Sequence, residues 1–244
     1  MTSFDGKVVL VTGSSSGIGE AAARAFADAG ATVVVNSASS VAAGQALAAS
    51  LPGASYVQAN IADEDEAARL VATTLRHHGR LDVLVNNAGV TQVIPHSDLR
   101  AADLSVWKRI FDVNVFGTWA VTVAAVEALR ASRGAIINVS SVTGVRPIGS
   151  SIPYACSKAA INHQTVLLAK ALGPEVRVNA VAPGLIDTPW TADMDKMRQF
   201  VSEVAPLRRS GTTDEVASMM LTLAASPYVT GQVVAVDGGL NIAI

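Results

Sequence analysis

Short runs of β-branched residues alternate with longer alanine-rich segments along almost the whole chain. The runs have the length of buried strands, and the segments between them have the length and spacing of helices. The expected strands are residues 7–12, 32–35, 55–58, 81–85, 135–139, 176–181 and 233–236, and the expected helices are residues 20–30, 41–51, 63–78, 114–131, 151–173 and 213–225. This alternation predicts an α/β fold, a doubly wound parallel sheet of about seven strands with helices on both faces.

No proline-rich or serine-rich linker divides this series, and no repeat beyond the strand–helix unit is present. Half of the 244 residues are hydrophobic, which is enough for a full core. We therefore expect residues 1–244 to form a single domain that carries both a cofactor site and a substrate site.

Three glycines, Gly13, Gly17 and Gly19, follow the first expected strand and precede the first expected helix. Glycine lets the backbone turn tightly and approach a phosphate, and the start of a helix offers free N–H groups. The spacing differs from the commoner Gly-x-Gly-x-x-Gly pattern, and a glycine-rich turn alone is a weak signal. Its place after the first strand favours a Rossmann-type pyrophosphate site over a plain connection.

A tyrosine and a lysine lie four positions apart, at Tyr154 and Lys158, in the helix expected over residues 151–173. That step places both side chains on one helix face, where the ammonium group favours ionisation of the phenol. Ser141 follows the strand expected at 135–139, so its hydroxyl would lie at the carboxyl edge of the sheet, where such folds bind ligands. A phenol whose pKa is lowered towards neutral suits general acid–base catalysis. For this pair alone, a solvated helix face without chemistry remains the alternative.

Composition excludes several classes of protein. The formal net charge of −2 gives no basic field for nucleic acid. The single cysteine, Cys156, rules out an internal disulfide bond and fits a reducing compartment, so a cytoplasmic location is expected. No signal-peptide pattern or membrane-spanning stretch is recognisable, so no membrane partner is expected. The histidines and acidic residues have no metal-ligand spacing, and no metal site is expected.

Seven separated motifs resemble those of the short-chain dehydrogenase/reductase family. They are Thr12-Gly-x-x-x-Gly-Ile-Gly19, Asn86-Asn-Ala-Gly89, Asn114, Ser141, Tyr154-x-x-x-Lys158, Pro183-Gly184 and Val236-Asp-Gly-Gly239, in the family's order. The resemblance implies an NAD(P)-dependent oxidoreductase that transfers hydride between nicotinamide and the carbon of a secondary alcohol or ketone. It also implies a catalytic tetrad of Asn114, Ser141, Tyr154 and Lys158.

In such enzymes the serine bonds the substrate oxygen and the tyrosine passes the proton. The lysine bonds the nicotinamide ribose and lowers the tyrosine pKa, while the asparagine holds a water. The cofactor contacts that the resemblance implies are Gly13, Ser15, Ser16, Gly17, Ile18, Gly19, Asn36, Ser37, Asn60, Ile61, Asn87, Ala88, Gly89, Tyr154, Lys158, Pro183, Gly184, Ile186 and Thr188. At Asn60 the family usually has an aspartate that bonds the adenine ring.

No charged residue decides which cofactor is used. NAD enzymes generally place an acid at the end of the second strand, whereas a basic residue there, or just before Gly17, favours the 2′-phosphate of NADP. The candidates here are uncharged: Asn36, Ser37, Ser39, Ser40 and Ser16. Because a missing carboxylate removes repulsion against a phosphate, NADP(H) is favoured over NAD(H).

The side chains expected around the reacting carbon are mainly apolar, which favours an apolar small-molecule ketone or alcohol, although each residue could equally pack in the core. They are Gln92, Ser141, Val142, Val145, Ile148, Leu185, Trp190 and Met194. Two alternatives stay open. One is a 3-oxoacyl-[acyl-carrier-protein] reductase, although the Gln-Ala-Asn common before the tyrosine of that branch is missing. The other is a non-catalytic dinucleotide-binding sensor or scaffold, which would not need all four tetrad residues.

The resemblance also implies an assembly. The long helices expected at 114–131 and 151–173 pair across a two-fold axis in this family, so a homodimer or homotetramer is expected.

Overall fold

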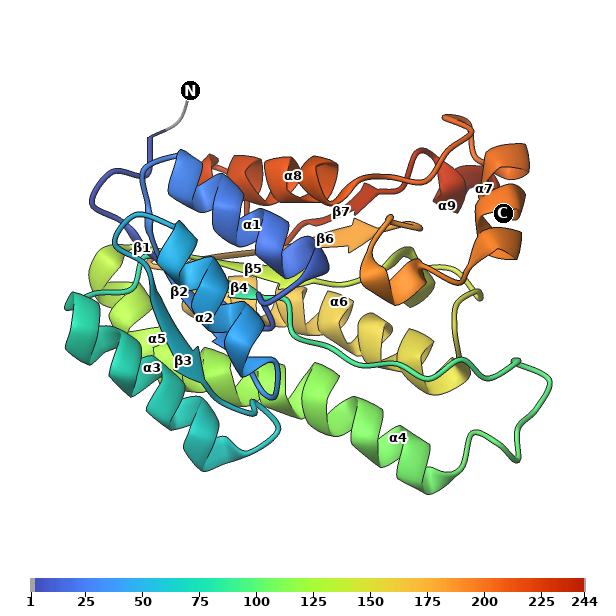
Figure 1. The fold of residues 1–244 in the computed structure, drawn as a ribbon, viewed down its shortest axis with the longest axis horizontal. Helices are drawn as coiled ribbons and strands as arrows, with labels where there is room; N and C mark the ends of the chain where they lie inside the picture. Colours follow the sequence, from blue (N-terminus) through green and yellow to red (C-terminus); the bar gives the residue numbers. More distant parts are fainter. Residues whose placement is uncertain (1–2, 244) are drawn as a thin grey trace.

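Seven parallel strands form one sheet in the order β3-β2-β1-β4-β5-β6-β7 (Figure 1). The computed structural model describes residues 3–243. The strands are β1 Val8–Val11, β2 Thr32–Ser37, β3 Ser55–Gln58, β4 Val83–Asn86, β5 Ala135–Val139, β6 Arg177–Pro183 and β7 Val233–Val236. The strand order reverses between β1 and β4, and open sheets of this kind bind ligands at the carboxyl edge beside that point. The predicted doubly wound, Rossmann-type sheet is confirmed.

Helices cover both faces of the sheet. They are α1 Gly17–Asp28, α2 Val41–Ser50, α3 Glu64–His78, α4 Leu104–Phe111, α5 Thr118–Ser132, α6 Ile152–Leu172, α7 Asp195–Val204, α8 Thr213–Ala225 and α9 Leu240–Ala243. A π-helical segment, Asp112–Gly117, joins α4 to α5, and two short 3₁₀ turns lie at Val142–Gly144 and Pro189–Thr191.

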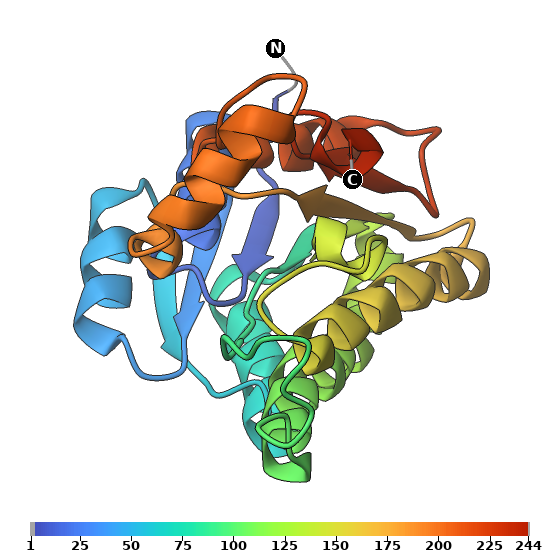
Figure 2. The same ribbon diagram turned by 90° about the vertical axis from the view of Figure 1, so that its right-hand side faces the viewer.

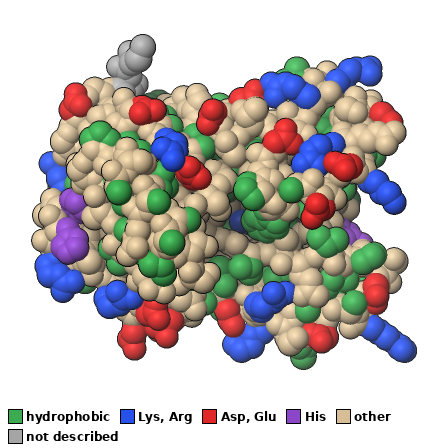
Figure 3. Space-filling model, in the orientation of Figure 1, with side chains coloured by type: hydrophobic (Ala, Val, Ile, Leu, Met, Phe, Trp, Pro, Cys, Tyr) green, Lys and Arg blue, Asp and Glu red, His purple; other side chains and the backbone are tan. Residues whose placement is uncertain are grey.

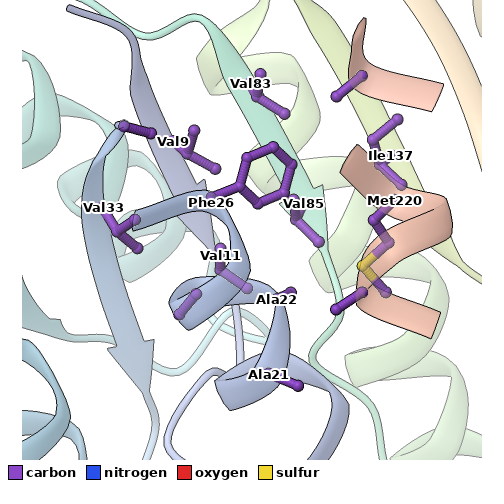
Figure 4. Packing of buried hydrophobic residues seen from close by; sticks show 14 of the residues in the cluster. Val9, Val11, Ala21, Ala22, Phe26, Val33, Val83, Val85, Ile137 and Met220 are labelled. Carbon is purple, nitrogen blue, oxygen red and sulfur yellow. The ribbon is translucent and has the colours of Figure 1, made fainter. Parts of the chain in front are cut away.

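One core lies between the sheet and the helices α1, α2 and α8. Figure 4 shows Phe26 of α1 beside Val9 and Val85 of the sheet, with Met220 of α8 next to Ile137. All five side chains are fully buried. The β-branched residues that predicted the strands are therefore the residues that fill this layer, and truncating Phe26 to alanine would cost about 3–5 kcal/mol.

The second core lies under α3, α5 and α6 on the opposite face. By length and composition alone, the run Leu104–Ser132 would be able to cross a membrane. In the fold, however, Val121 and Leu129 are fully buried against the sheet, and Thr122 accepts a hydrogen bond from Asn86. The apolar stripe of this run is thus a core face of the α/β domain.

Most predicted elements match the structure to within a few residues, and one differs substantially. The helix expected from residue 114 begins at Leu104, because Asp103 caps it by accepting hydrogen bonds from the N–H groups of Ser105 and Val106. The helical run then passes through the π-helical segment that contains Asn114. Helices α7 and α9 were not among the expected elements.

The loops after β4, β5 and β6 meet at the carboxyl edge of the sheet, together with α7. Figure 2 looks at this edge, with α7 in orange in the upper part and the loop after β4 in the lower part. Between them lies the space in which the predicted site residues gather.

Candidate active site

A cleft of about 1330 Å³ opens at the carboxyl edge. Figure 3 shows it as a hollow near the middle of the face, with hydrophobic side chains along its margin. All of the expected cofactor contacts line this cleft: Gly13, Ser15, Ser16, Gly17, Ile18, Gly19, Asn36, Ser37, Asn60, Ile61, Asn87, Ala88, Gly89, Tyr154, Lys158, Pro183, Gly184, Ile186 and Thr188. A single drug-sized ligand occupies about 300–1,000 Å³, so the cleft has room for a dinucleotide and a second molecule.

The glycine turn forms one arm of the cleft and tolerates no side chain at two points. Gly13 has φ +60°, and a Cβ there would lie 2.8 Å from the Cα of Ala88. A Cβ on Gly19 would lie 2.4 Å from Nδ2 of Asn87, which donates to the carbonyls of Thr12 and Gly13. This close packing brings the start of α1 to the cleft wall, and no side chain caps that helix start. Its open N–H groups and dipole suit a pyrophosphate.

Asn36, one residue before the end of β2, belongs to the cleft wall but uses its side chain for hydrogen bonds within the protein. Its Oδ1 accepts from the N–H of Gly13, and its Nδ2 donates to the carbonyls of Val57 and Ala59. The residue is only 1% exposed. Asn36 therefore braces the glycine turn with its side chain, and the groups that face the cleft at this end of β2 are those of the following residues, Ser37, Ala38, Ser39 and Ser40.

Asn60 lies at the far end of the same arm. Its Oδ1 accepts from the N–H of Ala62, while its main-chain N–H donates to Glu66. Within residues 3–243, Nδ2 of Asn60 has no hydrogen-bond partner, so this amide is available as a donor to a ligand.

Tyr154 is positioned by the first turn of α6. Ser151 caps that helix by accepting a hydrogen bond from the N–H of Tyr154, and Pro153 adds a preset backbone angle in the first turn. Ser141 caps the 3₁₀ turn after β5 in the same way, because its Oγ accepts from the N–H of Thr143. The hydroxyl hydrogen of Ser141 is left to donate elsewhere, and both residues line the cleft.

Lys158 lies one turn further along α6, and only 5% of it is exposed. Its Nζ donates a 2.8 Å hydrogen bond to the carbonyl of Val139 and lies 5.6 Å from the centre of the Tyr154 ring. A Cβ on Gly89 would lie 3.6 Å from this nitrogen, so the loop after β4 closes over the amine.

Burial moves the pKa values of both groups against their charged forms. It lowers the pKa of Lys158 to about 8. It also raises the pKa of Tyr154 to about 12, and contact with the Ser141 hydroxyl offsets this only in part. The expectation of a lowered tyrosine pKa therefore does not hold for the protein chain by itself. The reason is that the amine is itself desolvated and its hydrogen bond goes to Val139.

Asn114 does not line the cleft but lies directly behind it, 1% exposed. Its Oδ1 accepts from the N–H of Val90, and its Nδ2 donates to the carbonyl of Val90 and to Oγ of Ser157. Ser157 in turn donates to the carbonyl of Tyr154. Asn114 thus ties the loop after β4 to the first turns of α6, and so holds the tyrosine and lysine relative to that loop.

Six of the eight residues expected around the substrate line the cleft: Ser141, Val142, Ile148, Leu185, Trp190 and Met194. The expectation is corrected at Gln92 and Val145, which lie outside the lining. The Gln92 amide oxygen accepts a hydrogen bond from Arg109 of α4, which holds it away from the cleft. Val145 follows the 3₁₀ turn and is half exposed to solvent.

Several lining residues were not expected. Val93, Met197 and Phe200 contribute large apolar side chains to the cleft. Ala38, which directly follows β2, also lines it. The 197, 200, 201, 204 spacing of apolar residues in α7 was the available signal, because it marks one helix face. What the spacing does not show is that this face points into the cleft.

Known proteins resemble the chain over almost its full length. The sequence profile of a family described as enoyl-(acyl carrier protein) reductase matches residues 13–241. A candidate ketoacyl reductase 2 of the granaticin polyketide synthase of Streptomyces violaceoruber is 54% identical over 239 residues, which cover 96% of each chain. The 3-oxoacyl-[acyl-carrier-protein] reductase of Thermotoga maritima is 41% identical, over 98% of this chain and 99% of its own.

Solved structures agree with these sequence matches. A gluconate 5-dehydrogenase from Burkholderia cenocepacia, in complex with NADP and tartrate, superposes with a TM-score of 0.92 and 29% identity, covering 100% of this chain and 98% of its own. Taken with the strand order and the seven motifs, these matches assign the fold and the reaction class together. The chain belongs to the short-chain dehydrogenase/reductase family, and it is an oxidoreductase of that family.

Proposed function

We propose that the protein catalyses NAD(P)-dependent hydride transfer between nicotinamide and the carbonyl carbon of an apolar ketone, or the reverse reaction on the secondary alcohol. Two observations on one cleft carry the proposal. Ser141, Tyr154 and Lys158 line the same cleft, and the start of α1, which follows the glycine turn and has no side-chain cap, forms another part of its wall. That part of the wall suits a dinucleotide, and the three polar side chains suit the oxygen of a reacting carbonyl.

The cofactor, when bound, supplies the hydride. The pyrophosphate would lie against the start of α1, with Asn60 as a donor to the adenine ring. Lys158 would donate to the nicotinamide ribose, and Thr188 would contact the carboxamide. The glycine turn supports this assignment, since Gly13 and Gly19 pack directly against Ala88 and Asn87 and so bring the start of α1 to the cleft wall.

During reduction, negative charge builds on the carbonyl oxygen. The free hydroxyl hydrogen of Ser141 and the phenol of Tyr154 would donate to that oxygen, and Tyr154 would give up its proton to it. With a pKa of about 12, the phenol is fully protonated at neutral pH and can act as an acid. Asn114 is a positioning residue in this scheme, since it acts through Val90 and Ser157.

NADP(H) is the proposed cofactor. The residues facing the cleft at the end of β2 are Ser37, Ala38, Ser39 and Ser40, so no carboxylate opposes a 2′-phosphate there. Hydroxyl groups and the start of α2 can donate to that phosphate. The NADP complex of the Burkholderia gluconate dehydrogenase is consistent with this choice.

A second candidate is the reduction of a 3-oxoacyl thioester carried by acyl carrier protein. The relatives from Streptomyces and Thermotoga favour it, because both are named for ketoacyl reduction. The chemistry at the carbonyl is the same in both candidates, and only the group attached to the ketone differs.

We also propose a homodimer or homotetramer in the cytoplasm. Large apolar side chains on the π-helical segment, α5 and α6 are exposed in the monomer: Phe116, Trp119, Val123, Val166 and Leu167. A second copy of the chain would cover this face.

The test is a steady-state screen that follows nicotinamide absorbance with NADPH and NADH. The substrates are simple ketones and an N-acetylcysteamine 3-oxoacyl thioester. Turnover of simple ketones supports the leading candidate, and turnover of the thioester at least a hundredfold faster favours the second. Absence of turnover with every carbonyl compound would contradict both.

A further inference from the structure

We propose that Val93, Met197 and Phe200 form an outer apolar subsite, which binds the hydrocarbon part of the substrate beyond the reacting carbon and selects bulky ketones over short ones. This inference rests on the proposed function and adds to it the size of the substrate. Its basis is a group of large apolar side chains that the fold leaves uncovered inside the cleft.

The helix α7 has more apolar surface than its packing uses. Val201 is 1% exposed and packs with Val142 and Leu240, which fixes one side of the helix to the body of the protein. Met197 and Phe200 belong to the same stripe but remain 44% and 41% exposed. Both line the cleft. Since the anchoring contacts do not cover them, a ligand in the cleft is what would remove them from water.

The other wall of the subsite comes from the loop after β4. Val93 is 68% exposed and also lines the cleft. Its neighbour Ile94 is buried and donates its main-chain N–H to the carbonyl of Ser150, so this part of the loop is held in place. Figures 1 and 2 both show this loop and α7 on opposite sides of the edge. An apolar group between them would contact both walls.

The subsite continues from the reacting centre through Trp190. The Trp190 ring stands edge-on to the Tyr154 ring, with centroids 6.3 Å apart and planes at 74°. Arg198 of α7 fixes the turn that carries Trp190, because it donates to the carbonyls of Thr191 and Ala192. The apolar wall therefore extends from Tyr154 through Trp190 to Phe200. Because Arg198 holds the Trp190 turn against α7 before a ligand binds, less conformational entropy is lost on binding.

Charged side chains also line this part of the cleft, at Asp193, Asp195 and Lys196. The subsite is therefore apolar along Val93, Met197 and Phe200 and charged beside them. Arg198 pairs with Asp187 and Asp195, so its charge is balanced within the segment that carries Trp190 and α7. A substrate whose far end is apolar gains from the wall, and a short polar substrate gains nothing. Each methylene buried there would improve binding about fourfold, until the subsite is full.

The experiment compares kcat/KM for 2-butanone, 2-hexanone and 2-octanone at saturating NADPH. For the wild type we expect the 2-octanone to 2-butanone ratio to be at least tenfold. In the double variant Met197→Ser/Phe200→Ser we expect this ratio to fall below threefold. The matched control is Leu104→Ser, which changes an exposed leucine outside the cleft lining, and its ratio should equal that of the wild type. Melting temperatures establish that each variant is folded.

A binding measurement separates this inference from the proposed reaction. Calorimetric titration of 2-octanone and 2-butanone into the protein with NADP⁺ forms a complex that cannot turn over, and 2-octanone should bind at least tenfold more tightly. Turnover of all three ketones with a flat ratio would overturn the subsite and leave the reaction standing. Tight binding of 2-octanone without any turnover would overturn the reaction and keep the subsite. Equal binding of the two ketones would overturn the subsite in either case.

Discussion

The Nζ atom of Lys158 lies 5.6 Å from the centre of the Tyr154 ring, one turn further along α6. It donates to the carbonyl of Val139, and burial lowers its pKa from 10.5 to about 8. The fold therefore keeps a lysine in surroundings that disfavour its charge. Such a position suits a group that meets its partners only when a cofactor binds, and it has a cost in stability.

We predict that Lys158→Met makes the cofactor-free protein more stable at pH 7. Below pH 8 the lysine is protonated in both the folded and the unfolded chain, so the full penalty of about 3 kcal/mol applies. Between pH 8 and 10.5 the folded amine is neutral while the unfolded one still binds a proton. The stability of the wild type relative to the variant therefore rises with pH across this window. Chemical denaturation at pH 7 and pH 10 measures the difference.

The matched control is Lys170→Met, on an exposed position of the same helix, and we expect no comparable gain from it. A Lys158→Met protein that is less stable than wild type at pH 7, or whose difference from wild type is the same at both pH values, would contradict the burial penalty.

The second prediction concerns the ionisation of Tyr154. Because burial raises the pKa of Tyr154 to about 12, the phenolate should not form below pH 11 in the protein without added cofactor. A bound NADP⁺ adds a positive nicotinamide beside the phenol and should lower that pKa by at least one unit. The measurement is ultraviolet absorbance near the phenolate band from pH 8 to pH 11, taken as wild type minus Tyr154→Phe. An identical titration with and without NADP⁺ would be the contrary result.

The third prediction separates two neighbouring positions at the end of β2. Ala38 is exposed and lines the cleft, so Ala38→Asp would put a carboxylate near the 2′-phosphate. We expect the NADPH to NADH ratio of kcat/KM to fall at least tenfold. Asn36→Asp would instead turn a carboxylate onto the carbonyls of Val57 and Ala59. We expect it to destabilise the fold by about 3 kcal/mol.

Kinetics with both cofactors and melting temperatures of both variants check these outcomes together. An Asn36→Asp protein with wild-type stability would show that the buried amide network is not needed. An unchanged cofactor ratio in Ala38→Asp would show that the phosphate is bound elsewhere.

Much of the fold could be predicted because the inner strands of the sheet are buried on both faces. The strands expected at 55–58, 135–139 and 233–236 match β3, β5 and β7 at both ends. The buried strand β5 is marked by its apolar run, whereas the partly exposed edge strands β3 and β7 are marked by their place in the strand–helix alternation. The start of α4 was missed although Asp103 is a capping residue, because Asp103 lies eleven residues before residue 114, where the expected helix began. The π-helical segment around Asn114 has no periodicity of its own, so no pattern in the sequence marks it.

For the site, motifs placed Tyr154, Lys158 and Ser141 at one cleft, because their spacing relative to α6 and β5 fixes where they lie. The direction of a side chain was harder to predict. Asn36 turns inward because the carbonyls of β3 need donors, and Gln92 is held by Arg109. Both outcomes depend on partners that are distant in the sequence. The apolar wall of α7 also depends on which face of that helix the body of the protein covers.

The central claim is that the phenol of Tyr154 passes the proton to the substrate oxygen, whereas binding of the dinucleotide to the glycine-turn side of the cleft does not need that phenol. The most direct measurement is the Tyr154→Phe variant, with NADP(H) binding followed by calorimetry and ketone reduction followed by nicotinamide absorbance. We predict a dissociation constant within about threefold of wild type and a kcat reduced by about 10²–10⁴-fold, the usual share of a general acid. A variant that binds the cofactor and reduces ketones at the wild-type kcat would contradict the account.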